Sequence, residues 1–121
     1  MNEKMTELQR IIELKKITNF KFSYYKDFIL KVVGSLDSDY YHNIDITFYG
    51  VSFLSCPTQM IDVKIRLGTN KEYEWLLQNH KISYLEDEDI LFCFTTKDDS
   101  DKYFIFGENF NFIVQDVEYE K

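Results

Sequence analysis

The sequence predicts an α+β fold, in which two N-terminal helices pack on one antiparallel sheet of about five or six strands and one further helix is inserted between strands. Three features predict this fold. Apolar residues near the N-terminus recur at helical spacing, the segment 61–67 alternates between apolar and charged residues, and the last third of the chain holds three aromatic-rich alternating segments. The 121 residues suffice for one hydrophobic core without disulfides, so we expect a single domain over 1–121.

The N-terminal third predicts two helices. The first covers 3–16, where Glu and Lys separate the apolar residues Met5, Leu8, Ile11 and Ile12. The second covers 24–33, with Ser23 as its N-cap and Gly34 as a left-handed residue at its C-terminal end. Its apolar stripe consists of Tyr25, Phe28, Ile29, Val32 and Leu36. The preceding Phe20-Lys21-Phe22 alternates and is also compatible with a short strand.

The middle of the chain predicts strands and the inserted helix. In 44–48 every second residue is apolar, and after Gly50 the apolar positions shift by one. A β-bulge or a tight turn at Tyr49-Gly50 accounts for the shift, and we favour the bulge because one glycine is a weak hairpin signal. Pro57 ends this strand because it has no N–H to donate.

The strand over 61–67 precedes a helix over 71–79. We expect Asn70 to be the N-cap of this helix, and Glu72 and Glu74 lie in its first turn, where acidic residues favour the helix dipole. The final third then predicts strands over 89–96, 102–106 and 110–119. The breaks between these strands are short and turn-like, so we expect an antiparallel meander.

The net charge of −7 is unevenly distributed. Residues 1–35 hold seven basic and four acidic side chains, whereas residues 36–121 hold seven basic and seventeen acidic ones. A nucleic-acid-binding protein needs a basic footprint, so we expect no direct nucleic-acid binding. No run of about 18 apolar residues could span a membrane, and the N-terminal segment lacks the apolar core of a signal peptide. We therefore expect a cytoplasmic protein with two reduced cysteines and no membrane association.

Residues that could carry chemistry are scattered along the chain. The histidines and cysteines lack the close pairs of a zinc site, since His42, Cys56, His80 and Cys93 are each thirteen or more residues apart. A reactive Cys56 would need a basic neighbour, and a Cys56–His42 pair stays open as the alternative to two structural residues. The acidic segment 98–101 lacks the spacing, the glycine and the distal glutamate of a calcium loop. We expect no enzyme, no metal site and no cofactor.

Acidic residues cluster at both ends of the predicted meander, about 20 Å apart for strands of seven residues. They either keep an aromatic-rich protein soluble or dock a basic partner, with charge steering the encounter. The candidate partner-binding residues are Glu86, Asp87 and Glu88 at one end, and Asp98, Asp99, Asp101, Asp116 and Glu118 at the other.

The run 45–58 (DITFYGVSFLSCPT), the strand 61–67 and the aromatic segment 102–106 resemble small uncharacterised bacterial α+β proteins. Some of these are encoded beside polymorphic toxins and are presumed immunity proteins. The resemblance implies a non-catalytic protein-binding domain that neutralises a basic toxin. Exposed aromatic residues would anchor such a partner, for example Tyr40, Tyr41, Tyr49 or Tyr119.

Two alternatives remain open. The first is a small-molecule-binding or regulatory domain with an apolar pocket lined by Phe between sheet and helices. The second is a homodimer whose sheet edge pairs with its copy through the aromatic strand at 102–114.

Overall fold

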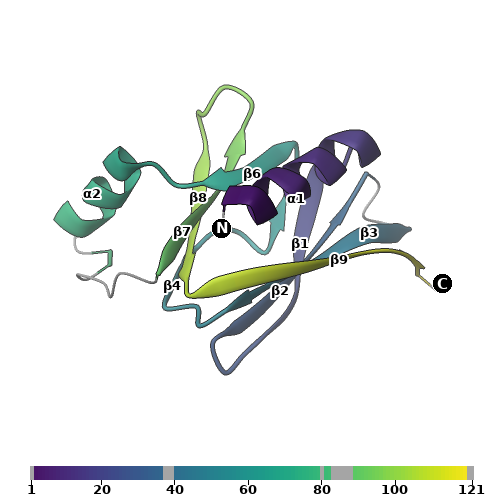
Figure 1. The fold of residues 1–121 in the computed structure, drawn as a ribbon, viewed down its shortest axis with the longest axis horizontal. Coiled ribbons are helices and arrows are strands. Elements are labelled where there is room, and N and C mark those ends of the chain that lie inside the picture. The colour runs from purple at the N-terminus through teal and green to yellow at the C-terminus, as the bar shows by residue number, and fades with distance from the viewer. Residues whose placement is uncertain (1, 37–39, 80, 83–88, 120–121) are drawn as a thin grey trace.

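The computed structural model describes residues 2–36, 40–79, 81–82 and 89–119, and it has two antiparallel sheets and two helices (Figure 1). The five-stranded sheet has the order β5-β1-β2-β3-β9 and the four-stranded sheet the order β4-β8-β7-β6. Strands of the first sheet are β1 (Asn19–Lys26), β2 (Ile29–Ser35), β3 (Tyr41–Tyr49), β5 (Gln59–Met60) and β9 (Asn109–Glu118). Strands of the second are β4 (Phe53–Ser55), β6 (Val63–Leu67), β7 (Ile90–Thr96) and β8 (Lys102–Gly107). The α+β class is confirmed, but two sheets replace the single predicted one.

The core lies between the two sheets and is built mainly from phenylalanine. The rings of Phe48 and Phe92, one from each sheet, lie 4.9 Å apart between centroids, and those of Phe20 and Phe94 lie 5.1 Å apart. All four side chains are fully buried. The aromatic alternation in the sequence therefore marks the inner faces of two packed sheets.

Helix α1 (Asn2–Lys15) confirms the first predicted helix and closes one open side between the sheets (Figure 1). Its apolar face buries Met5, Leu8 and Ile12 in the core. The Gln9 amide donates to the carbonyl of Ile65 on β6, and the Lys4 ammonium donates to the carbonyl of Phe110 on β9. Since β6 and β9 are edge strands, α1 bridges one edge of each sheet.

The second predicted helix, over 24–33, is wrong, because this segment forms the β1–β2 hairpin. Its turn is Asp27-Phe28, and both residues have positive φ, 53° and 66°, as a type I′ turn requires. The alternating residues Leu30 and Val32 are fully buried. They lie on β2, which pairs with β1 on one side and with β3 on the other. Burial between sheets therefore overrides the helical spacing of the other apolar residues.

The predicted meander is only partly right. Strands β7 and β8 pair as expected, but β9 leaves their sheet and pairs with β3. The chain changes sheets at Gly107, where an added Cβ would lie 2.9 Å from the backbone oxygen of Tyr49. The predicted bulge at Tyr49-Gly50 is likewise a change of sheet, with Gly50 at φ 62° between β3 and β4. The parity shift in the sequence after Gly50 thus marks a corner between the two sheets.

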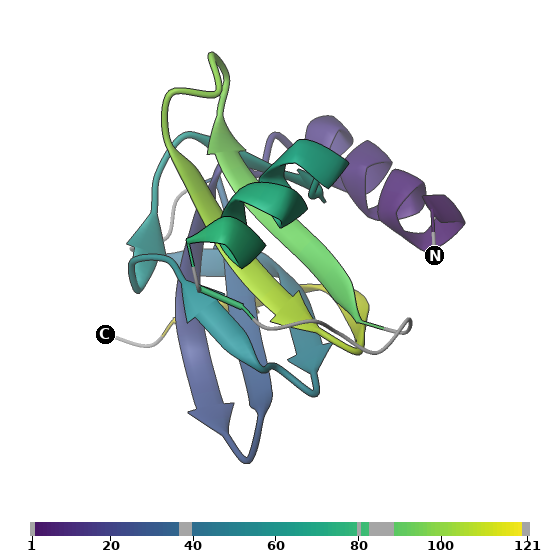
Figure 2. The same cartoon turned by 90° about the vertical axis from the view of Figure 1, so that its left-hand side faces the viewer.

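Helix α2 (Asn70–Gln78) confirms the inserted helix and covers the outer face of the four-stranded sheet (Figure 2). Its Leu76 packs in a cluster with Leu91, Cys93, Phe104 and Phe106. The N-cap is Thr69 rather than the predicted Asn70, because Thr69 forms a capping box with Glu72. Neither described helix is long and apolar enough to cross a membrane.

Candidate functional site

The β7–β8 turn carries three of the predicted partner-binding carboxylates, and all three are exposed. Asp98 accepts hydrogen bonds from the Thr96 hydroxyl and the Ser100 backbone N–H, at 3.0 and 3.1 Å. Hydrogen bonding to Ser100 and Thr96 lowers the pKa of Asp98. Asp99 accepts from the Thr95 hydroxyl at 2.9 Å. Two of these three carboxylates therefore also hold the turn in shape.

The structure does not bring the other predicted carboxylates to this turn. Asp116 and Glu118 lie on β9 in the other sheet, toward the C-terminal end, away from the β7–β8 turn in both views (Figures 1 and 2). Asp116 accepts a hydrogen bond from the Asn43 amide of β3 at 2.8 Å. The stretch 86–88, with its three predicted carboxylates, lies outside the described residues.

An ionic network around the buried Glu72 carboxylate joins α2 to the four-stranded sheet. The Glu72 side chain is only 8% exposed and forms two hydrogen bonds with the Arg66 guanidinium, at 2.7 and 2.9 Å. The Lys102 ammonium lies 3.2 Å from the same carboxylate. The Arg66 hydrogen bonds lower the pKa of Glu72 to about 2. The sequence signal for this site was the capping box Thr69-x-x-Glu72, which our sequence reading missed.

Neither thiol is set up as a nucleophile. Burial raises the pKa of Cys56 to about 12 and that of Cys93 to about 11. A thiol with a raised pKa holds almost no thiolate at neutral pH. The ring of His42 contacts Tyr119 and Asp45, so the Cys56–His42 alternative receives no support from the geometry.

The His42 imidazole links the end of β9 to β3. Its Nδ1 lies 2.9 Å from the Tyr119 hydroxyl, and its Nε2 lies 2.7 Å from Asp45 Oδ1. Asp45 Oδ1 is buried and has no aligned hydrogen-bond donor despite this short distance. The Lys21 ammonium lies over the Tyr119 ring, 4.6 Å from its centroid. This cluster fastens strands that are far apart in sequence.

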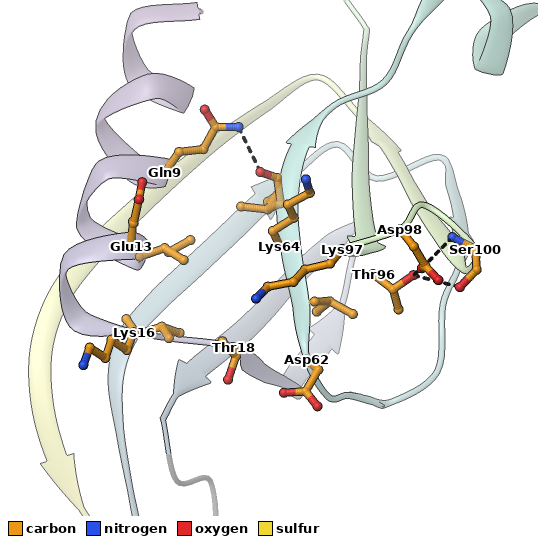
Figure 3. Close-up of a pocket in the computed structure, with 14 residues that line it drawn as sticks. Gln9, Glu13, Lys16, Thr18, Asp62, Lys64, Thr96, Lys97, Asp98 and Ser100 are labelled. Atoms are coloured by element: carbon orange, nitrogen blue, oxygen red, sulfur yellow. Dashed lines mark hydrogen bonds between the residues drawn. The ribbon is translucent and has the colours of Figure 1, made fainter.

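An open groove of about 1100 Å³ lies between α1, β6 and the β7–β8 turn (Figure 3). Its apolar lining consists of Ile12, Ile17, Val63 and Ile65. Both signs of charge line it as well, from Glu13, Lys16, Asp62, Lys64, Lys97 and Asp98. Figure 3 shows Lys97 extending across β6 toward α1. The groove offers an apolar surface with charged groups, and no phenylalanine lines it, because the buried Phe rings are packed in the core.

The tip of the β1–β2 hairpin exposes three aromatic side chains. We call Tyr24, Tyr25 and Phe28 the hairpin tip, and they are 49%, 52% and 67% exposed. In both views the turn of this hairpin projects at one end of the molecule (Figures 1 and 2). The Val51 N–H donates to the Phe28 carbonyl at 2.8 Å, which holds the turn against the β3–β4 corner. Sequence reasoning missed this feature because it placed all three residues on a helix.

Phe28 occupies a backbone conformation that disfavours it. Its φ of 66° lies in the left-handed region, which costs a residue with a Cβ about 1–2 kcal/mol. Type I′ turns prefer glycine there, and the exposed ring gains no burial in return. A bulky residue kept in such a conformation points to a role outside folding.

The aromatic anchors named from the sequence are less suitable. Tyr40 and Tyr49 are exposed, but Tyr41 and Tyr119 are half-buried, and Tyr119 is engaged by His42. Within the described residues, no three His, Cys, Asp or Glu side chains are grouped to hold a metal ion. Comparison of the chain with protein-family models, curated proteins and solved structures finds no match.

Proposed function

We propose that this chain is a non-catalytic protein-binding domain, and that the hairpin tip anchors its partner. The observation that carries the proposal is the exposed Phe28 ring at a positive-φ turn position, flanked by two exposed tyrosines. Aromatic residues dominate the energetics of protein interfaces, where a buried ring contributes roughly 2–4 kcal/mol. A rigid hairpin presents these rings with little loss of conformational entropy on binding.

The partner that we propose is a basic protein, most concretely a toxin that this chain neutralises. The net charge of −7 and the exposed carboxylates of Asp98, Asp99 and Asp101 support it, since charge of one sign attracts a basic partner over long range. The acidic turn and the hairpin tip lie at opposite ends of the molecule (Figures 1 and 2). The carboxylates would therefore affect the association rate, and the rings the lifetime of the complex. We propose the cytoplasm as the compartment, because both cysteines are unpaired thiols.

Affinity capture from host lysate with matched variants tests this function. The tip variant is Tyr24→Ser/Tyr25→Ser/Phe28→Gly, which keeps the fold because the rings are exposed and glycine accepts the turn conformation. The control is Trp75→Ser, which removes an equally exposed aromatic ring from α2. We expect wild type and control to retain one basic protein at low salt and to bind it more weakly at moderate salt. The tip variant should not retain this protein.

Two outcomes would overturn the proposal. If no protein is retained at either salt concentration, the binding function is wrong. If the tip variant retains the same protein as wild type, the hairpin tip is not the anchor.

A second candidate function is the binding of a small amphipathic molecule, and the groove favours it. The groove combines an apolar lining with lysine and carboxylate groups, which suits a ligand with an apolar body and a charged end. We expect such a ligand to raise the melting temperature of wild type, and not that of Lys64→Trp, whose ring would fill the groove. Lys71→Trp on the exposed face of α2 is the control and should behave as wild type. Equal shifts in all three proteins would place the ligand elsewhere.

A further inference from the structure

Strand β9 is the free edge of the five-stranded sheet. It pairs with β3 on one side, and no strand of the described chain lies on its other side (Figure 1). Natural sheets usually protect such an edge with charge, proline or a covering element. Residues 109–115 of β9 contain no charged residue and no proline. Apart from the Lys4 ammonium on the Phe110 carbonyl, this edge lacks such protection and is a template for another strand.

The hydrogen bonds of Phe110 show which backbone groups face the free side. Its N–H donates to Asn109 Oδ1 and its carbonyl accepts from the Lys4 ammonium, both at 2.8 Å, so neither group joins the ladder with β3. Residues in an antiparallel strand point their backbone groups alternately toward and away from the neighbouring strand. Phe112 and Val114 therefore also point their backbone groups to the free side, where the described residues provide no comparable cap.

Apolar side chains accompany these backbone groups. Ile113 is 59% exposed on the outer face of the sheet, and Val114 is exposed beside it. On α1, Ile11 follows Lys4 on the same flank, about two helical turns further along. The free edge thus combines unpaired backbone groups with an apolar margin.

We infer that β9 pairs antiparallel with β9 of a second copy of this chain, which joins two five-stranded sheets into one. In the register we infer, Phe112 pairs with Val114 of the second copy. This register places Ile113 opposite the partner's Ile113 at the two-fold axis, where side chains of a non-hydrogen-bonded pair are closest. Asn111 then lies opposite the partner's Gln115, so amides flank the apolar centre.

Charge supports a second copy in this register. The register brings the acidic end of the partner's β9, with Asp116 of the partner subunit, alongside Phe110, whose carbonyl holds the Lys4 ammonium. Because β9 shifts register against β3 between Val114 and Val117, Asp116 lies near this end of the edge and is not directly paired with Phe110. Asp116 is exposed, and each two-fold interface contains this arrangement twice. Shifting the register by two residues in either direction removes the pairing of Ile113 with its copy, and it moves Asp116 of the partner subunit two residues along the edge relative to Lys4. The surface is therefore self-complementary in one register.

Sedimentation velocity over a range of concentrations tests the inference. We expect wild type to form a dimer, and Ile113→Lys to raise its dissociation constant by roughly 100-fold, because two like charges meet at the axis. The control is Tyr49→Lys, which adds the same charge on the same face of the sheet but on β3, away from the edge. It should leave the dissociation constant unchanged.

A charge exchange distinguishes the pairing from a general loss of structure. Lys4→Glu and Asp116→Lys should each raise the dissociation constant by roughly 10-fold, and the double variant should restore it because the opposite charges face each other again. Hydrogen exchange should show slow Phe112 and Val114 amides in wild type and fast ones in Ile113→Lys. A wild-type monomer at several hundred micromolar would overturn the inference, as would a dimer that Ile113→Lys and Tyr49→Lys affect equally. Both of these results are independent of the hairpin tip, so the dimer and the proposed partner binding can fail separately.

Discussion

Phe48→Ala should lower the free energy of unfolding by about 4 kcal/mol, since truncating a buried phenylalanine removes its transfer free energy and leaves a cavity. Phe48 is fully buried, and its ring contacts those of Phe92, Phe94 and Phe110. Phe92 and Phe94 belong to the other sheet, so the loss reports on packing between the sheets. Urea unfolding followed by circular dichroism measures it.

Phe28→Ala is the matched control for this prediction. It removes the same side chain from an exposed position, and we expect a change within about 0.5 kcal/mol. The contrast separates two roles of phenylalanine in one chain, packing at Phe48 and partner binding at Phe28. Equal losses in the two variants would contradict both the buried core and the exposed hairpin tip.

Glu72→Gln should lower the free energy of unfolding by about 3 kcal/mol at neutral pH, because it removes the carboxylate that pairs with Arg66 in a partly buried site. The Arg66 hydrogen bonds lower the pKa of Glu72 from 4.5 to about 2, and lowering a pKa by one corresponds to about 1.4 kcal/mol. A lowered pKa means that the folded state favours the ionised form. The stabilisation is therefore complete above pH 4.5 and is lost as pH falls toward 2.

Urea unfolding of wild type and Glu72→Gln between pH 7 and pH 2 tests this dependence. The difference between the two proteins should be constant at higher pH and should shrink below pH 4.5. Glu74→Gln, an exposed residue on the same helix, is the control and should differ little from wild type at any pH. A difference that does not change with pH would mean that the ion pair is not the source of the stability.

The spacing of apolar residues correctly predicted those elements in which buried residues recur at one regular interval, either that of a helix or that of a strand. Helix α1 and strands β6, β7 and β8 lie within a few residues of their predicted bounds. The segment that contains β1 and β2 was ambiguous, because Tyr25, Phe28, Ile29 and Val32 fit helical spacing while Leu30 and Val32 alternate. Pairing with β3 and β5 decides between the two, and a local pattern does not contain those partners.

The candidate sites were harder to predict than the strands. The Asp98, Asp99 and Asp101 turn could be located because Asp and Ser in a row are typical of turns. The link between His42 and Tyr119 joins residues 77 positions apart, and the exposed hairpin tip exists only because 19–35 is a hairpin. No spacing rule connects such residues, since their contact depends on strand pairing.

The sequence by itself determined the α+β class, the antiparallel strands of the second half, the two helices that form and the acidic character of the surface. These features follow from the order of apolar and charged side chains along the chain, because that order depends on which residues are buried and which are exposed. Only the tertiary structure decided that the strands divide into two sheets, that β9 crosses to β3, and which aromatic residues lie outside the core. Strand pairing is made by backbone groups that nearly every residue carries, so its choice of partner depends on how the whole chain packs.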